Sequence, residues 1–437
     1  TLGASGDTIN LASGASQSGF GRTGTVDWQT GDIKTATFTA ANGEGYFANT
    51  SGGAFTVNLP AGVAGAIVSF ADYAGTWQTN NVTVAPNGTD KIGSTNANAT
   101  LNVEGQSVTF VFVDSTQGWI NTMDSTSNVR AASFVTATVS GACNTLVTAP
   151  CCANTKIATF TGPGTFCVSA IASSPTNNVV SYLVVAGGGS GGSGNVGGGG
   201  GAGGYREVKS PVTPYTASPL DGYGTPGNRI TVTAQAYSIA VGGGGPTPNG
   251  NGNPSTFSSI TSTAGGAGRG GATTGNTGGS GGGGGEGGGG GGAGNTPPVS
   301  PPQGRPGGTS PSTRGGGGGG ADGPGCSGTP GPGGGGIGTG TQINPAAGTP
   351  GPSGPLKYFA GGGGGGSYKC GSYTPSGPGG YGGGGAGAVG GPGDTAGVAG
   401  TDNTGGGGGG TGYTAGPSAG GAANGGSGIV IIRYKFQ

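Results

Sequence analysis

Histidine is absent from this 437-residue chain, so the side chain that most often acts as a general base or as a metal ligand is missing. Paired carboxylates could still cleave glycosidic bonds. The acidic residues show no such pairing and fit solvated turns; examples are Glu44, Asp72, Asp90, Glu104 and Asp114. We therefore expect no enzyme, no metal site and no cofactor. The chain should act by binding.

Charge and hydropathy exclude two further classes of partner. Fifteen basic and fifteen acidic residues cancel, and no basic stripe marks a nucleic-acid surface. No apolar run reaches the roughly 20 residues that a membrane-spanning helix needs. We expect neither nucleic-acid binding nor membrane insertion.

Six cysteines could form disulfides, and they stand in two groups. Cys143, Cys151, Cys152 and Cys167 lie close together in the sequence, whereas Cys326 and Cys370 flank a glycine-rich section. No CxxC pair is present, so zinc is not indicated. Disulfides would suit an extracellular particle, with Cys326–Cys370 as one possible pair. The alternative is a set of buried free thiols.

Glycine dominates the second half of the chain. The sequence holds 118 glycines and 29 prolines, and one stretch reads GGSGGGGGEGGGGGGAGN (278–295). Such runs are ordinarily flexible linkers. Polyglycine can instead form extended helices with three residues per turn, which bond N–H to C=O between neighbours when packed side by side. The low charge and the recurrence of the runs favour this packed bundle over disorder.

Before the glycine runs, the sequence changes character twice. Residues 1–30 are small and polar, which suggests an extended connector that packs against other copies of the chain. Residues 31–123 contain short alternating segments such as AFTVNL (54–59) and SVTFVFV (107–113), separated by turn signals. This pattern predicts an antiparallel β-sandwich, with Trp77 and Trp119 in its core or at an interface. Residues 124–140 are polar and are expected to form a linker.

Residues 141–437 are predicted to form one glycine-rich domain. Its β-strand base is expected over 153–186, 205–241 and 428–436, and its polyglycine bundle over 187–204 and 242–427. The closing strand GIVIIRYKFQ needs a partner, for which the best candidates are the strands at 182–185 and 237–241. The predicted fold class is thus all-β: an extended connector, an antiparallel sandwich, and a β base that carries a packed polyglycine II bundle.

Three stretches resemble the glycine-rich domain of bacteriophage tail fibres and related virion adhesins. They are YLVVAGGGSGGSGNVGGGGGAGGYRE, YSIAVGGGGPTPNGNGNPSTFSSITSTAGGAG and GGSGIVIIRY. The upstream GEGYFANTSGGAFTVNLPAGVAGAIVSFADYAGTW resembles the β domain of marine-phage tail fibres. The resemblance implies an extracellular, virion-attached structural protein that is often trimeric. Its N-terminal end would join other tail proteins, and its distal end would bind a host cell-surface glycan or outer-membrane protein.

In such an adhesin the host contacts would come from the turns between glycine runs. Aromatic side chains stack on sugars, and polar groups bond to their hydroxyls. The candidate receptor-binding residues are Tyr215, Tyr223, Arg305, Arg314, Tyr358, Tyr368, Lys369 and Tyr373. Each of these residues could equally cap or pad the bundle.

Two other functions remain open from the sequence. The chain could be a purely structural extracellular filament or surface protein without an adhesin role. It could also be an ice-binding polyglycine protein, although the irregular runs and long proline-rich loops do not favour that interpretation.

Overall fold

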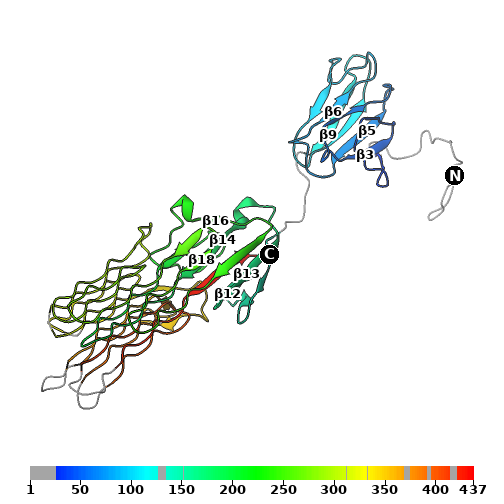
Figure 1. Ribbon diagram of the computed structural model, residues 1–437. Helices are drawn as coiled ribbons and strands as arrows, with labels where there is room; N and C mark the ends of the chain where they lie inside the picture. Colours follow the sequence, from blue (N-terminus) through cyan, green and yellow to red (C-terminus); the bar gives the residue numbers. More distant parts are fainter. Residues whose placement is uncertain are drawn as a thin grey trace. The chain divides into compact units, whose positions relative to one another are not determined.

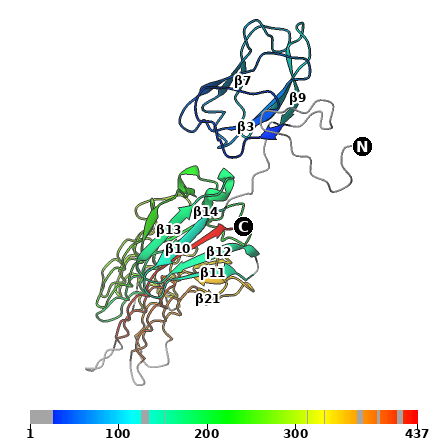
Figure 2. The same ribbon diagram turned by 90° about the vertical axis from the view of Figure 1, so that its right-hand side faces the viewer.

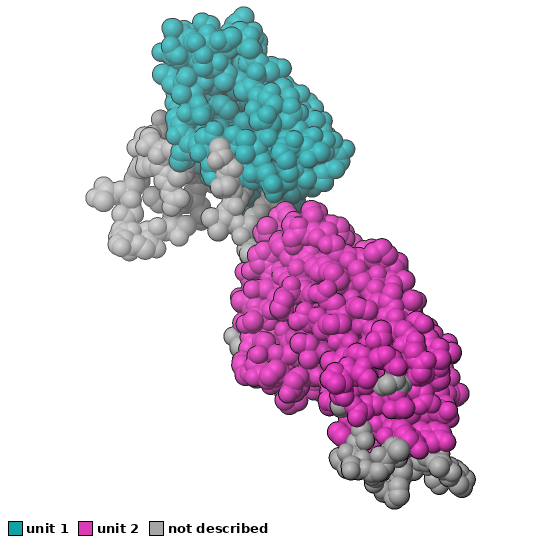
Figure 3. All heavy atoms as spheres, turned by 90° about the vertical axis from the view of Figure 1, so that its left-hand side faces the viewer, with its two compact units in different colours: residues 1–131 teal, residues 132–437 magenta. Residues whose placement is uncertain are grey.

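The computed structural model describes residues 26–125, 134–150, 152–311, 313–331, 333–368, 375–390, 395–413 and 421–437. The chain divides into two compact units, Thr1–Ala131 and Ala132–Gln437 (Figure 3). Strands dominate the regular structure in both units, and the only helices among the described residues are two short 3-10 helices, η1 (Pro175–Asn178) and η2 (Pro226–Asn228). The all-β fold class is confirmed.

The first unit consists of two sheets that face one shared core. One sheet has the order β1 (Asp27–Trp28), β3 (Glu44–Ala48), β5 (Ile67–Asp72), β8 (Ser107–Phe112) and β9 (Trp119–Ser125). The other has the order β2 (Phe38–Thr39), β4 (Phe55–Asn58), β6 (Val82–Ala85) and β7 (Ala99–Leu101). Both tryptophans that the sequence assigns to the core or to an interface, Trp77 and Trp119, are fully buried in this core.

The two sheets of the first unit are mixed, which corrects the antiparallel sandwich expected from the sequence. Strands β1, β3 and β5 run parallel, and so do β2, β4 and β6. The chain crosses from one sheet to the other after each of the first five strands, so neighbours within a sheet are second neighbours in sequence and point the same way. Only β5–β8–β9 and β6–β7 are antiparallel. Buried and exposed residues alternate in the same way along parallel and antiparallel strands. The alternation in the sequence therefore could not distinguish the two arrangements.

The β base of the second unit contains three sheets (Figure 1). The first has the order β10 (Thr136–Ser140), β13 (Gly164–Ala170), β17 (Ala236–Ala240), β18 (Ser255–Phe257) and β19 (Ile260–Ser262). The second has the order β11 (Thr145–Ala149), β12 (Cys152–Phe160), β23 (Ile429–Lys435), β14 (Val179–Val185) and β15 (Tyr205–Val208), with β16 (Ile230–Thr231) also paired to β14. The third has the order β20 (Thr339–Thr341), β22 (Lys357–Phe359) and β21 (Thr349–Pro350).

The base is therefore larger than the sequence pattern indicated. Strand β10 lies inside the expected linker 124–140, and β18 to β22 lie inside the expected bundle 242–427. These last five strands have only two or three residues each. Segments that short show no period-2 pattern long enough to recognise.

Strand β23 lies at the centre of the second sheet, between β12 and β14. The predicted pairing of the closing strand with residues 182–185 is confirmed by the pairs Tyr182–Ile432 and Val185–Ile429. The second candidate partner, at 237–241, instead pairs with β13 and β18. Hydrophobic clusters cover both faces of this second sheet, which we call the central sheet. Because both faces are buried, the sequences of β14 and β23 are continuous apolar runs.

The glycine segments pack side by side beyond the base (Figures 1 and 2), and the run 196–204 shows how. Its N–H groups donate to segments 263–269, 316–319 and 405–411, and its carbonyls accept from segments 186–192, 280–286 and 363–366. The N–H groups of Gly197, Gly200 and Gly203 all reach the same neighbour, at Thr411, Gly408 and Gly405. A repeat of three residues with six bonded neighbours is what packed polyglycine II helices require.

Close backbone contact, rather than an unusual backbone angle, demands glycine in this bundle. A Cβ on Gly200 would lie 2.0 Å from the carbonyl oxygen of Gly189, and one on Gly199 would lie 1.9 Å from that of Gly363. Neither glycine has a φ in the left-handed region. The neighbouring chain itself occupies the space that a side chain would need.

We expect Gly200→Ala to destabilise the second unit by about 3 kcal/mol or more, because a backbone cannot move aside as a side chain can. Gly243→Ala is the matched control: its Cβ would meet only the amide of Asn253, at 3.7 Å. That variant should stay within about 1 kcal/mol of the parent chain. Thermal and urea unfolding of the full chain, followed by circular dichroism, measure both. Equal stability of the two variants would contradict the close backbone packing described for Gly200.

Candidate functional site

The glycine segments gather several turns at the end of the bundle that lies away from the sheets, which we call the distal end. Segments 186–192 and 361–368 leave β14 and β22 directly, and at about 3.1 Å per residue they extend about 20–25 Å from the base. Backbone pairs between Val196 and Glu286, Gly289 and Ser310, Arg314 and Ser367, and Tyr368 and Tyr413 join these segments near their turns. One small surface thus collects residues from many parts of the chain.

Two of the candidate receptor-binding residues lie at the distal end. Tyr368 is half-buried, and its ring centroid lies 4.9 Å from that of Tyr413. Arg314 is half-buried and donates to the carbonyl of Pro330. Tyr413 was missed in the sequence, although it follows the glycine run 405–412 much as Tyr368 follows 361–366. Lys369 and Tyr373 lie outside the described residues.

Tyr215 and Tyr223 belong to the β base instead. The Tyr215 hydroxyl donates to the carbonyl of Val208 at 3.4 Å, and the guanidinium of Arg433 lies 5.2 Å from the ring. Burial raises the pKa of Tyr215 well above its ordinary value. Tyr223 packs against the larger hydrophobic cluster of the β base, and the Arg229 guanidinium lies 4.3 Å from its ring. Both tyrosines therefore have contacts that a structural role explains.

Arg305 belongs to a proline-rich loop that is anchored at the base rather than at the distal end. Its Nε donates to the backbone carbonyl of Asp322 at 3.2 Å. Upstream, the amide of Asn228 donates to the carbonyl of Ser300 at 2.8 Å, and Tyr205 N–H donates to the carbonyl of Gln303 at 2.8 Å. Residues 295–303 thus line the side of the base.

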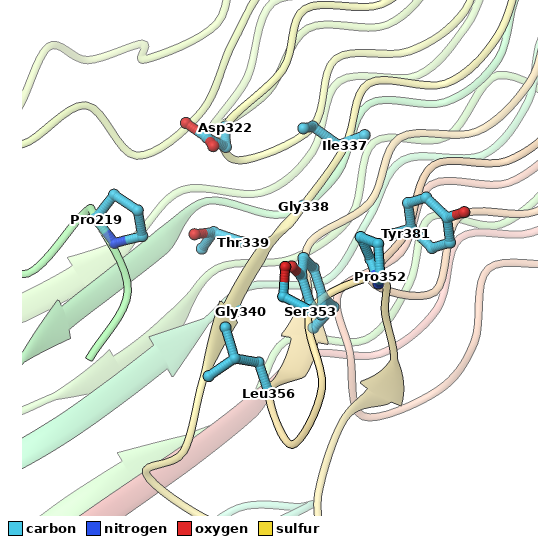
Figure 4. A pocket seen from close by; sticks show the side chains of 11 residues that line it. Pro219, Asp322, Ile337, Gly338, Thr339, Gly340, Pro352, Ser353, Leu356 and Tyr381 are labelled. Atoms are coloured by element: carbon cyan, nitrogen blue, oxygen red, sulfur yellow. The ribbon is translucent and has the colours of Figure 1, made fainter. Parts of the chain in front are cut away.

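Tyr358, on β22, lines a lateral pocket of about 380 Å³ (Figure 4). Four segments of the chain and Tyr381 surround this lateral pocket: the loop at Pro219, the turn at Asp322, the segment 337–340 and the loop 352–356. In Figure 4 Asp322 and Pro219 lie on one side, Tyr381 lies on the other, and Thr339 lies between them. The volume is within the range of small-molecule sites.

The cysteines show no disulfide among the described residues. No disulfide joins Cys143, Cys152, Cys167 or Cys326 to another described cysteine, and the thiol of Cys152 donates to the carbonyl of Pro214 at 3.6 Å. Cys151 and Cys370 lie outside the described residues, so the pairing of Cys326 with Cys370 stays a prediction. In the described part of the chain, no group of three or more His, Cys, Asp or Glu side chains could hold a metal ion.

Glu207 is a buried carboxylate, and its surroundings indicate a structural role. The hydroxyls of Tyr205 and Thr341 each donate to it at 2.6 Å, and Ser218 N–H donates at 3.0 Å. It thereby joins β15 to β20 and to the intervening loop. Burial raises its pKa, and the three donors offset part of that effect. Asp114 accepts backbone N–H bonds within its own turn. Asp72, expected to be solvated, is instead buried, and it accepts N–H bonds from Gly75 in its own turn and from Gly105 in another loop.

The raised pKa of Glu207 predicts a pH-dependent contribution to stability. A proton held more tightly in the folded state stabilises it below the ordinary glutamate pKa of about 4.3, and this contribution is lost as the pH rises through the folded pKa. Glu207→Gln removes the titration, and Thr341 can turn its hydroxyl to the carbonyl of Thr216, which it already approaches. The melting temperature of this variant relative to the parent chain should rise from pH 4 to pH 8. Glu286→Gln is the control for lost charge, and an unchanged difference across this range would refute the prediction.

The family model described as a glycine-rich domain matches residues 161–435, which is more than half of the chain. No curated protein matches the sequence. Within the described residues, no helix is both long and apolar enough to span a membrane.

Proposed function

The chain belongs to the glycine-rich domain family, and we propose that it is a structural and receptor-binding protein of a bacteriophage tail fibre. Its distal end would attach the virion to a host cell-surface glycan or outer-membrane protein. The protein would be extracellular and would assemble as a homo-oligomer, with a trimer as the expected form. Residues 1–30, most of which lie outside the described residues, would join it to other tail proteins.

The observation that carries this proposal is the gathering of separate turns on one rigid support. Each glycine helix is bonded to its neighbours along its length, and described turn residues add backbone bonds of their own, such as those from Glu286 N–H to Val196 and from Gly288 N–H to Ser310. Because these bonds use backbone atoms, the side chains at the turns can change without removing them. Binding residues are commonly found on loops that a rigid scaffold positions. Arg314, Tyr368 and Tyr413 supply cationic and aromatic groups of the kind that is enriched in binding surfaces.

Adsorption of the labelled full-length chain to a panel of bacterial cells tests this proposal. We expect saturable binding to some strains, and at least a tenfold loss of affinity in the double variant Tyr368→Ala/Tyr413→Ala, which corresponds to about 1.4 kcal/mol. Tyr223→Ala is the control, because it removes an aromatic side chain from the base. Circular dichroism of all variants checks that they are folded.

Two results would overturn the adhesin role. If the folded chain binds no strain in a panel that includes the phage's own host, the structural-filament alternative is favoured. If the distal variant binds as well as the parent chain, recognition lies elsewhere in the molecule.

A further inference from the structure

We infer that the lateral pocket binds a hexopyranose that is neutral or carries an amino group. This inference rests on the proposed function for the source of the sugar, a surface glycan. Its geometry is independent of the distal end, since the pocket is formed by β20, β22 and the loops beside them. It would give the fibre a second contact, on the side of the second unit.

Two tyrosine rings form an aromatic wall in the pocket. The ring centroids of Tyr358 and Tyr381 are 6.4 Å apart, with an interplanar angle of 57°. Tyr381 is 54% exposed, which leaves its ring accessible to a ligand. The C–H-rich face of a pyranose is an apolar surface that can stack on such a ring, whose face carries partial negative charge.

The backbone of two neighbouring glycines lies against the Tyr358 ring and fixes its position. A Cβ on Gly340 would lie 2.8 Å from this ring, and a Cβ on Gly351 would lie 2.1 Å from it. Neither glycine has a φ in the left-handed region, so the space that glycine leaves is what the ring requires. The Tyr358 half of the aromatic wall is thus held between β20 and the residue that follows β21.

Polar groups around the same pocket have no partner in the described parts of the chain. They are the carboxylate of Asp322 and the hydroxyls of Thr339, Ser353, Tyr358 and Tyr381. The backbone of Asp322 is fixed, because its N–H donates to Ile337 and its carbonyl accepts from Arg305. Hydroxyl-rich ligands need such donors and acceptors, and a carboxylate forms the stronger, charge-assisted bonds with hydroxyl groups.

The charge of the lining restricts which sugars fit. Asp322 is the only charged side chain among the residues that line the pocket. An acidic sugar would place a second negative charge near it, whereas a neutral sugar would not. Arg305 donates to the backbone carbonyl of Asp322 but forms no ion pair with its carboxylate and does not line the pocket, so no lining cation compensates that charge. Glycosidases use two carboxylates, and this lining offers one, so the pocket fits binding rather than cleavage.

Saturation-transfer NMR and calorimetry on the full-length chain test this inference. The probes are methyl glucoside, methyl galactoside, N-acetylglucosamine and glucosamine, with glucuronic acid as the acidic counter-probe. We expect at least one neutral or amino sugar to bind more tightly than glucuronic acid. Tyr381→Ala should weaken that binding about tenfold, in line with the loss of one aromatic contact of about 1.4 kcal/mol. Asp322→Asn should reduce the preference over glucuronic acid.

The control is Tyr73→Ala, since Tyr73 lies in the first unit and is 53% exposed. It should leave sugar binding unchanged. No binding of any neutral or amino sugar, equal binding in Tyr381→Ala, or binding of a proline-rich peptide in place of sugars would overturn the inference. Cell adsorption separates the two proposals. If the parent chain adsorbs to cells but binds none of the neutral or amino sugars, only the pocket inference is refuted. If it binds a sugar but adsorbs to no cells, only the adhesin role of the distal end is refuted.

Discussion

Close contact between glycine backbones is the constraint on which the second unit depends. Every buried N–H and C=O group needs a hydrogen-bond partner. A β-strand satisfies its groups with two neighbours, whereas the run 196–204 is bonded to six. Six neighbours can approach only when no side chain intervenes, and carbonyl oxygens occupy the positions where Cβ atoms would be. The interior of the bundle is therefore a hydrogen-bonded lattice without a hydrophobic core.

The β base sets the register of that lattice. The last pair between β14 and β15 is Val185 with Tyr205, and the next bond runs from Ala186 N–H to the carbonyl of Gly204. The sheet ladder thus passes directly into the bundle. Ala202, Ala321 and Ala360 lie at this junction, where they belong to the same hydrophobic cluster as the outer face of the central sheet. Alanine replaces glycine where the glycine helices contact apolar strands of the base.

Sequence patterns predicted the parts of this fold that follow from local chemistry. The lattice could be inferred because long glycine runs leave few other ordered states, and the pairing of β23 with β14 could be inferred because an apolar closing strand needs a partner. The strand directions in the first unit could not be inferred, because alternation within a strand carries no information about its neighbours. Nor could the positions of Tyr215 and Arg305, since distance along a proline-rich loop does not indicate which end of the bundle it reaches.

The lattice also determines where recognition chemistry can lie. The bundle interior admits few side chains, and the buried ones are mostly small, such as those of Ser190, Ala267 and Ser280. Aromatic and charged groups therefore stand at its turns or along its margin. Arg314, Tyr368 and Tyr413 occupy the first kind of position, and the lateral pocket with Tyr358 and Tyr381 occupies the second. Because each neighbour is met at every third residue, a helix can lengthen by three residues and still face the same partners. Such a scaffold can vary its ends while its bonded interior stays unchanged, and this property suits the receptor-binding role that we propose.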